Sequence, residues 1–386
     1  MGAARVAAPT FRSPGPSSRA RVTPLALIFL IVGVPALGGL VYVFVRGSAG
    51  LRRFIITRIG LTVPMVFILA SLVFFVMRVI PGDPVRSALG PKGSPETVQR
   101  MRDSLGLNDP LLVQYGRFLV GVVTLDFGNS LVGGRRPVVD EMSERFPATL
   151  ELVIPASVLA LGLGIVGGTY AAARRKRPAD YGLRLYSVVI YSIPIFWLGL
   201  LFQLVFGVRL GWLPIAGRID AVIGTGLERT TNILMIDSLV QGDWAAFRSA
   251  FVHTILPVTT LGLILSGVFL RLTRINVIET LQMDYIGAAR ARGIRERVVV
   301  GGHALKNAII PVITLLGLQV AILLAGAVLT ETVFSWPGMG QYLVQRISAR
   351  DYTAVQGVIT MFAMLVALIS LAVDIVYSLV DPRVRY

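Results

Sequence analysis

Runs of about twenty apolar residues recur along the chain, separated by segments rich in charge and proline. A helix of about 20 residues is long enough to cross the ~30 Å hydrocarbon layer of a membrane. The apolar runs are Pro24–Val45, Ile55–Val79, Leu150–Ala172, Leu185–Val208, Thr254–Leu272, Ala308–Leu329 and Val355–Val380. The pattern predicts an all-α polytopic membrane protein, with six core transmembrane helices and one extra transmembrane helix at the N-terminus.

The composition agrees with this class. Of 386 residues, 54% are hydrophobic and 15% are charged, and the mean hydropathy is +0.73. The interior of a water-soluble domain cannot absorb so much apolar surface, so we expect most of it to face lipid or neighbouring helices.

Positive charge is concentrated in alternate loops. Two loops have a large excess of basic residues, one following Ala172 and one following Leu272. Their basic residues are Arg174, Arg175, Lys176, Arg177 and Arg184 in the first, and Arg271, Arg274, Arg290, Arg292, Arg295, Arg297 and Lys306 in the second. Acidic and basic residues balance in the segments 80–150, 209–252 and 330–352. The positive-inside rule therefore predicts that the basic loops and the C-terminus are cytoplasmic and the balanced segments external.

Membrane topology accounts for the net charge of +16. No aromatic residues alternate with the basic ones as in a single-strand groove, so we expect no nucleic-acid partner. The run Arg174–Arg177 is most simply a topology determinant, and a lipid-headgroup or regulatory site is the alternative.

The N-terminal extension has two parts. Residues 1–23 are rich in Ala, Pro, Ser and Arg without apolar periodicity, which predicts a disordered basic tail. Residues 24–46 are interpreted as the extra transmembrane helix, and an uncleaved signal-like segment or a misassigned start are the alternatives. Labelling of a cysteine at Ser17 only from the inside would contradict the spanning helix.

The external segment 80–150 contains two predicted helices. Ser94 followed by Pro95 is a helix start with a capping side chain, and Asp109-Pro110 begins a second helix in the same way. The second has an apolar stripe that includes Tyr115. These helices either cap the outer ends of the spans or contact a soluble partner.

No catalytic or cofactor chemistry is visible. Cysteine is absent, only two histidines occur, and there is no GxxxxGK[ST] phosphate loop. We expect no metal and no cofactor, and a transport subunit rather than an enzyme. Glu151 and Asp374 look like isolated acids, which favours helix-packing or end-of-span roles over a proton relay.

The cytoplasmic loop 278–306 has the pattern of helix, turn and helix. Asp284 to Pro311 contains a paired Ala288-Ala289, then Gly293, then a second helical run that includes Asn307. Alanines on one helix face allow another surface to approach closely, and glycine permits a left-handed turn. The arginines of this loop add donors for acidic groups. The loop is therefore a candidate docking element.

This loop resembles the "EAA" loop of the inner-membrane permeases of bacterial ATP-binding-cassette importers. The matching positions are Tyr285, Ala288, Ala289 and Gly293, while Gly287 departs from the glutamate of many members. That departure is typical of the dipeptide and oligopeptide branch. Other matching segments are IPGDPV, RFPATLEL, YSIPIFWLG, MIDS, HTILP, TETVFSWPGMG, RDY and the terminal DPRVR. The resemblance covers residues 51–386. Over these residues the chain is similar to the first of two paired permeases.

The resemblance implies a type I importer permease in a bacterial inner membrane. Its partners would be a second homologous permease, two cytoplasmic ABC ATPase subunits that hydrolyse ATP, and an extracellular solute-binding protein that delivers a peptide. Nickel or another small solute is an alternative cargo, and an ATPase-independent secondary transporter is a second alternative. The ATPase-coupling residues would be Tyr285, Ala288, Ala289, Arg290, Gly293, His303 and Asn307.

A further candidate site follows the fifth core span. Phe334, Trp336, Pro337 and Gly338 form an aromatic turn typical of a membrane interface. We interpret it as a structural anchor or as an outer gate or docking patch.

Overall fold

The computed structural model describes residues 38, 49–79, 83–89, 94–132 and 136–380. Within these residues the regular elements are helices, and the β pairing is limited to an isolated bridge between Asn129 and Pro137. The predicted all-α fold is confirmed. The predicted tail 1–23 and, apart from Gly38, the predicted helix 24–46 lie outside the described residues.

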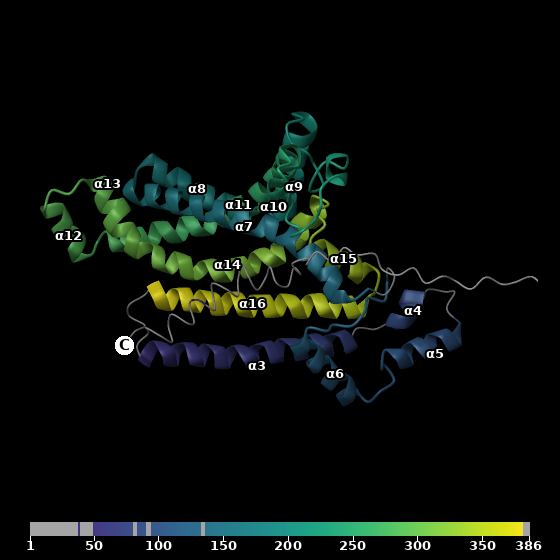
Figure 1. Cartoon of the computed structure of the whole chain (residues 1–386). Coiled ribbons are helices and arrows are strands. Elements are labelled where there is room, and N and C mark those ends of the chain that lie inside the picture. Colours follow the sequence, from purple (N-terminus) through teal and green to yellow (C-terminus); the bar gives the residue numbers. More distant parts are fainter. Residues whose placement is uncertain (1–37, 39–48, 80–82, 90–93, 133–135, 381–386) are drawn as a thin grey trace, which may run out of the picture.

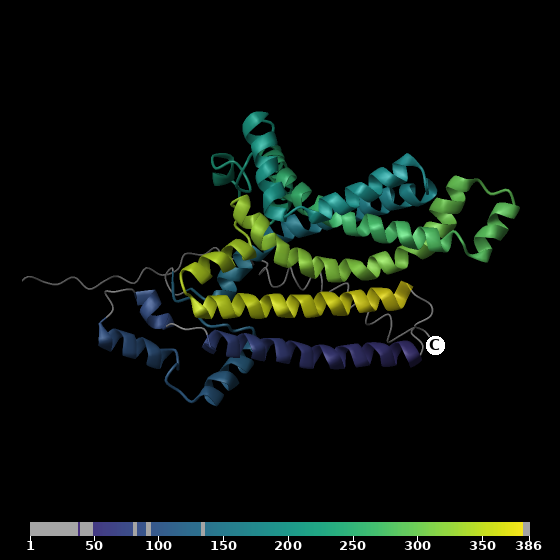
Figure 2. The ribbon, with the colours of Figure 1, turned by 180° about the vertical axis from the view of Figure 1, so that it is seen from behind.

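Five helices in the described part of the chain are long and apolar enough to cross a membrane. The fourth of them forms its candidate span together with the helical turns that precede it from Glu296. They are α3 (Ala49–Val79), α7 (Val138–Ala173), α11 (Trp244–Thr280), α14 (Leu305–Val333) and α16 (Tyr352–Val380). They lie side by side, with α3 next to α16, then α14, then α7 and α11 (Figure 1). The same order is seen from behind in Figure 2.

The third predicted core span is broken. The sequence predicts one span over Leu185–Val208, whereas the structure has α8 (Pro178–Ser192) and then α9 (Ile195–Phe202), which continues into the π-helix η3 (Gln203–Arg209). The two parts meet at 100°. The cause is local, because Pro194 lacks an N–H and forces the residue before it out of the helical region.

Shorter helices occupy the two ends of the bundle. At one end lie α4 (Pro84–Leu89), α5 (Pro95–Ser104), α6 (Leu111–Thr124), η4 (Ile223–Thr225), α10 (Leu234–Gln241) and α15 (Met339–Ser348). At the opposite end, which is also the end where α16 finishes, lie α12 (Asp284–Ala291), α13 (Glu296–Val298) and the π-helix η5 (Val299–Ala304) (Figure 1).

The two helices predicted in the segment 80–150, α5 and α6, are both present. Ser94 caps α5 by accepting a hydrogen bond from the Thr97 N–H at 3.2 Å, as predicted. The stripe on α6 faces α3, where the Tyr115 ring lies 5.2 Å from that of Phe74 and its hydroxyl lies 2.6 Å from Ser71. This face of α6 caps the span and is therefore not free for a soluble partner.

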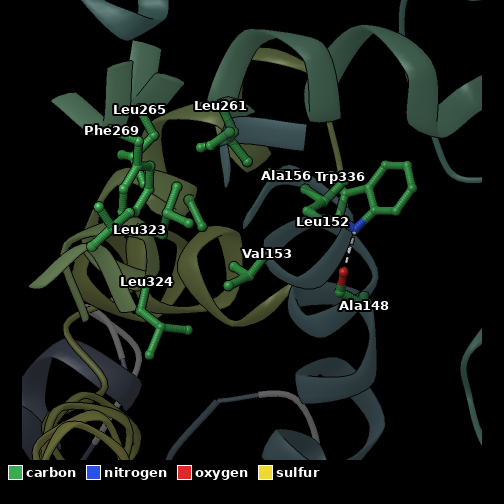
Figure 3. Packing of buried hydrophobic residues seen from close by; sticks show 13 residues of the cluster. Ala148, Leu152, Val153, Ala156, Leu261, Leu265, Phe269, Leu323, Leu324 and Trp336 are labelled. Atoms are coloured by element: carbon green, nitrogen blue, oxygen red, sulfur yellow. Dashed lines mark hydrogen bonds between the residues drawn. The ribbon is translucent and has the colours of Figure 1, made fainter. Parts of the chain in front are cut away.

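The core is built around the closely packed pair α7 and α11. A Cβ added to Gly164 would lie 2.3 Å from the Phe269 Cβ, and one added to Gly168 would lie 2.6 Å from the Thr273 Cβ. Only glycine permits this approach of two backbones, as is common between membrane helices. Leucine and valine side chains from these helices and from α14 fill the space around them (Figure 3).

Candidate functional site

The predicted helix–turn–helix loop is α12 with the turn that follows it. Gly293 has φ +75°, and its N–H donates to the Arg290 carbonyl at 2.9 Å. Because this left-handed conformation is strained for residues with a Cβ, glycine allows the chain to reverse after two turns of helix. The second helical run is not separate from the membrane span, since α13, η5 and α14 follow one another without a break and Pro311 lies inside α14.

One face of α12 is buried in the chain. Ile286 and Ala289 pack against Val277 of α11 and against Val299 and Val300 of η5. This cluster fixes α12 to the ends of the two membrane helices that the loop connects. A force applied to α12 would therefore be transmitted to α11 and α14.

The opposite face of α12 is open. Tyr285, Gly287, Ala288 and Arg290 are exposed, and a Cβ at Gly287 would meet no atom within 4 Å. The paired alanines thus have different surroundings, since consecutive helical residues point about 100° apart. Ala289 packs inside the chain, and Ala288 is available to another surface.

Polar contacts brace α12 against the helix that follows. The Asn307 amide donates to the Tyr285 hydroxyl at 2.7 Å, and Arg290 donates to the Glu296 carboxylate at 2.7 and 3.1 Å. The hydrogen bond to Glu296 raises the pKa of Arg290, which is therefore a permanent cation. His303 lies 3.2 Å from the Val298 carbonyl within the π-helical turn. The structure therefore brings six of the seven predicted coupling residues together on α12, its turn and the start of α14: Tyr285, Ala288, Ala289, Arg290, Gly293 and Asn307.

The predicted aromatic turn lies at the far end of α14 and is mostly buried. Trp336 is fully buried, and its indole N–H donates to the Ala148 carbonyl of α7 at 2.8 Å (Figure 3). Phe334 and Gly338 are also buried, whereas Pro337 is exposed. A Cβ at Gly338 would lie 2.2 Å from the Glu331 carboxylate. These positions favour the anchoring interpretation, and a docking or gating role stays a prediction.

A buried polar network around this turn was not expected. The Glu331 carboxylate accepts from the Thr149 hydroxyl at 2.6 Å and from the Gln341 N–H at 2.9 Å. In α15, the Tyr342 hydroxyl donates to Glu141 at 2.5 Å, and burial followed by this hydrogen bond raises the pKa of Tyr342 well above its usual range. The phenol is therefore neutral and can act as a donor.

The acids taken as isolated both have arginine partners. Glu151 accepts two hydrogen bonds from Arg218, at 2.5 and 3.0 Å, and the pair is buried. Arg218 also lies over the Trp336 ring at 5.6 Å. Asp374 of α16 lies 3.3 Å from Arg58 of α3. The prediction that these acids are isolated is therefore wrong. Their arginine partners are far away in the sequence, so no motif spacing could reveal them.

Comparison with known proteins identifies the family. The model of the binding-protein-dependent transport system inner membrane component matches residues 164–386, and the model of its N-terminal part matches residues 51–153. The chain belongs to this family. It is therefore a multi-pass membrane permease of a binding-protein-dependent transport system, and the resemblance drawn from the loop motif is confirmed.

Several curated members of this family align with most of the chain. The di/tripeptide transport system permease protein of Pseudomonas aeruginosa is 43% identical over 86% of this chain and 98% of its own length. The dipeptide transport system permease protein of Escherichia coli K12 is 40% identical over 86% and 99%. The glutathione transport system permease protein of the same organism is 37% identical, also over 86% and 99%.

Proposed function

We propose that this chain is the permease subunit of an ATP-driven importer for short peptides. The observation that carries the proposal is the identity of 40–43% over nearly the whole length of relatives named as dipeptide or di/tripeptide permeases. The glutathione permease also carries a peptide, by its name. These relatives do not favour nickel as the cargo, nor an ATPase-independent secondary transporter.

The proposed assembly has three kinds of partner. A second homologous permease forms the path together with this chain, and an extracellular solute-binding protein delivers the peptide. Two cytoplasmic ABC ATPase subunits supply the energy. No phosphate loop occurs in this chain, which agrees with nucleotide binding by a separate subunit.

The proposed orientation places α12 and the C-terminal end of α16 in the cytoplasm. Both lie at the same end of the bundle, as does the basic run Arg174–Arg177 after α7 (Figure 2). The excess of basic residues supports a cytoplasmic placement of this end.

The proposed coupling step uses the two faces of α12. Its open face, with Gly287 and Ala288, has the small side chains that a groove of an ATPase subunit can approach closely. Its buried face contacts α11 and η5. Closure of the ATPase dimer on ATP would displace α12 as a unit, and the buried cluster would pass that displacement to the membrane helices.

The test is transport by the complete importer in proteoliposomes. A dipeptide with its binding protein should stimulate ATP hydrolysis and be taken up, and loss of the catalytic glutamate in the ATPase should stop both. Gly293→Pro should abolish uptake and stimulation while the complex stays assembled. Uptake that persists in either variant would contradict the coupling proposal, and stimulation by a nickel complex alone would contradict the peptide cargo.

A further inference from the structure

A groove of about 520 Å³ lies between the cytoplasmic half of α7 and the segment Glu296–Leu305. Its walls are largely apolar, with Ile165, Val166 and Tyr170 on one side and Val300 on the other. The part of α7 from Ile165 to Ala173 is about 12 Å long at the rise of an α-helix. An apolar groove of this length at the end of a membrane helix has the dimensions of an acyl-chain segment.

The mouth of the groove is cationic. Arg174 directly follows α7 and Arg297 lies in α13, so both lie at the cytoplasmic end of the groove. Arg174 stacks on the Tyr170 ring at 5.2 Å. The run that begins at Arg174 adds three more exposed cations, up to Arg177.

Two acids near this mouth, one in the groove wall and one bonded to the Lys176 N–H, already have arginine partners. Asp180 accepts from Arg274 at 2.5 and 2.9 Å, and Glu296 is held by Arg290 at 2.7 Å. None of the cations of the mouth, Arg174–Arg177 and Arg297, has an ion-pair partner among the described residues. Topology explains why basic residues are here. It does not explain why Asp180 and Glu296 pair with other arginines and leave the positive charge of the mouth without a carboxylate partner in the described part of the chain.

The wall of the groove also contains an unused polar atom. The Thr169 hydroxyl is buried and has no hydrogen-bond partner in the described part of the chain. This oxygen is covered by the chain, so it is not part of the binding surface, and only the shape and charge of the groove favour a ligand.

We propose that this groove binds one anionic phospholipid, with its phosphate at Arg174 and Arg297 and an acyl chain along α7. The charge of the mouth selects an anionic headgroup, since each Lys or Arg near a membrane surface attracts anionic lipid. Val300 contributes both to the groove and to the cluster that seats α12. The bound lipid therefore supports the helix that follows the coupling loop. The proposal depends on this end being cytoplasmic, and not on the identity of the cargo.

The experiment uses the complete importer in nanodiscs of phosphatidylcholine and phosphatidylglycerol. Photoreactive analogues of both lipids are compared, and the labelled peptides are mapped by mass spectrometry. Phosphatidylglycerol should label the groove segments on the order of tenfold more than phosphatidylcholine, from the attraction of two arginines. Equal labelling by the two lipids would overturn the proposal.

Two matched pairs of variants locate the site. R174Q/R297Q should lose most of the selective labelling, whereas R175Q/R177Q removes the same charge outside the groove and should keep it. G301F fills the groove without touching the arginines, since a Cβ at Gly301 meets no atom within 4 Å. Its control is G162F on α7, where a Cβ is equally unopposed.

The variants also define what would overturn the proposal. An equal loss in both charge variants would mean diffuse attraction to the loop. Unchanged labelling in G301F would place the lipid elsewhere, and this variant decides the question should R174Q/R297Q fail to insert. Cross-linking of the groove residues to an ATPase subunit or the second permease would assign the groove to a protein partner.

Discussion

The two ends of α14 are built in opposite ways. At the end proposed to be cytoplasmic, called the inner end, α12 buries one face and exposes the other, and its polar contacts, such as Asn307 to Tyr285, are exposed. At the end proposed to be external, called the outer end, Trp336 and the Arg218–Glu151 pair are enclosed within the chain. Exposed braces contribute little stability and leave a surface for a partner, whereas a buried network fixes a joint. The two ends of α14 therefore differ in how firmly they are fixed, which is the contrast that the proposed coupling step requires.

The largest effect is expected at the buried ion pair of the outer end. Arg218→Ala leaves Glu151 charged and buried without its partner, which should cost about 3–5 kcal/mol of folding stability. The loss is measured as a drop in the unfolding midpoint of the detergent-solubilised complex. Arg136→Ala, which breaks an exposed pair with Glu144, should cost less than about 1 kcal/mol. Equal losses in the two variants would contradict the contrast.

The two alanines of the coupling loop offer a sharper comparison at the inner end. Ala288→Trp on the open face should leave stability within about 0.5 kcal/mol and reduce peptide uptake at least about tenfold, through a clash with the ATPase. Ala289→Trp overfills the buried cluster and should cost about 1–3 kcal/mol of stability. Uptake assays and thermal unfolding of both variants check this. Normal uptake in Ala288→Trp would contradict the hypothesis that the open face of α12 docks on the ATPase.

A variant at Trp336 distinguishes the anchoring role of the aromatic turn from a docking role. Trp336→Phe keeps an aromatic ring but loses the hydrogen bond to the Ala148 carbonyl, which should cost about 1 kcal/mol. An anchoring role predicts a lower unfolding midpoint with unchanged affinity for the loaded binding protein. A weaker affinity at unchanged stability would favour docking.

The smallest effect is expected for the brace of α12. Tyr285→Phe removes the hydrogen bond with Asn307. The Asn307 amide remains exposed to water, so stability should change by about 0.5 kcal/mol. Hydrogen exchange of the α12 amides should become faster while that of α11 stays the same. Protection of α12 that is identical to wild type would show that the brace does not hold the helix.

Much of this molecule follows from local signals in the sequence. Helix length and apolar runs predicted the spans, Ser94 with Pro95 predicted a capped start, and Gly293 predicted a left-handed turn. Each depends on neighbours within a few residues, where backbone sterics and hydrogen bonding decide the structure. The kink before Pro194 is equally local and was missed because the apolar run continues through it.

What only the tertiary structure decided are the contacts between distant segments. Arg218 meets Glu151 from 67 residues away, Trp336 meets Ala148 from 188, and Ala288 and Ala289 are separated into an open and a buried position by the packing of α11 and η5. The sequence by itself determined the membrane class, the loop motif and the family, because hydrophobicity, turn chemistry and motif spacing are properties of short stretches. Which faces are buried and which charges are paired depends on how the helices pack, and that is a property of the whole chain.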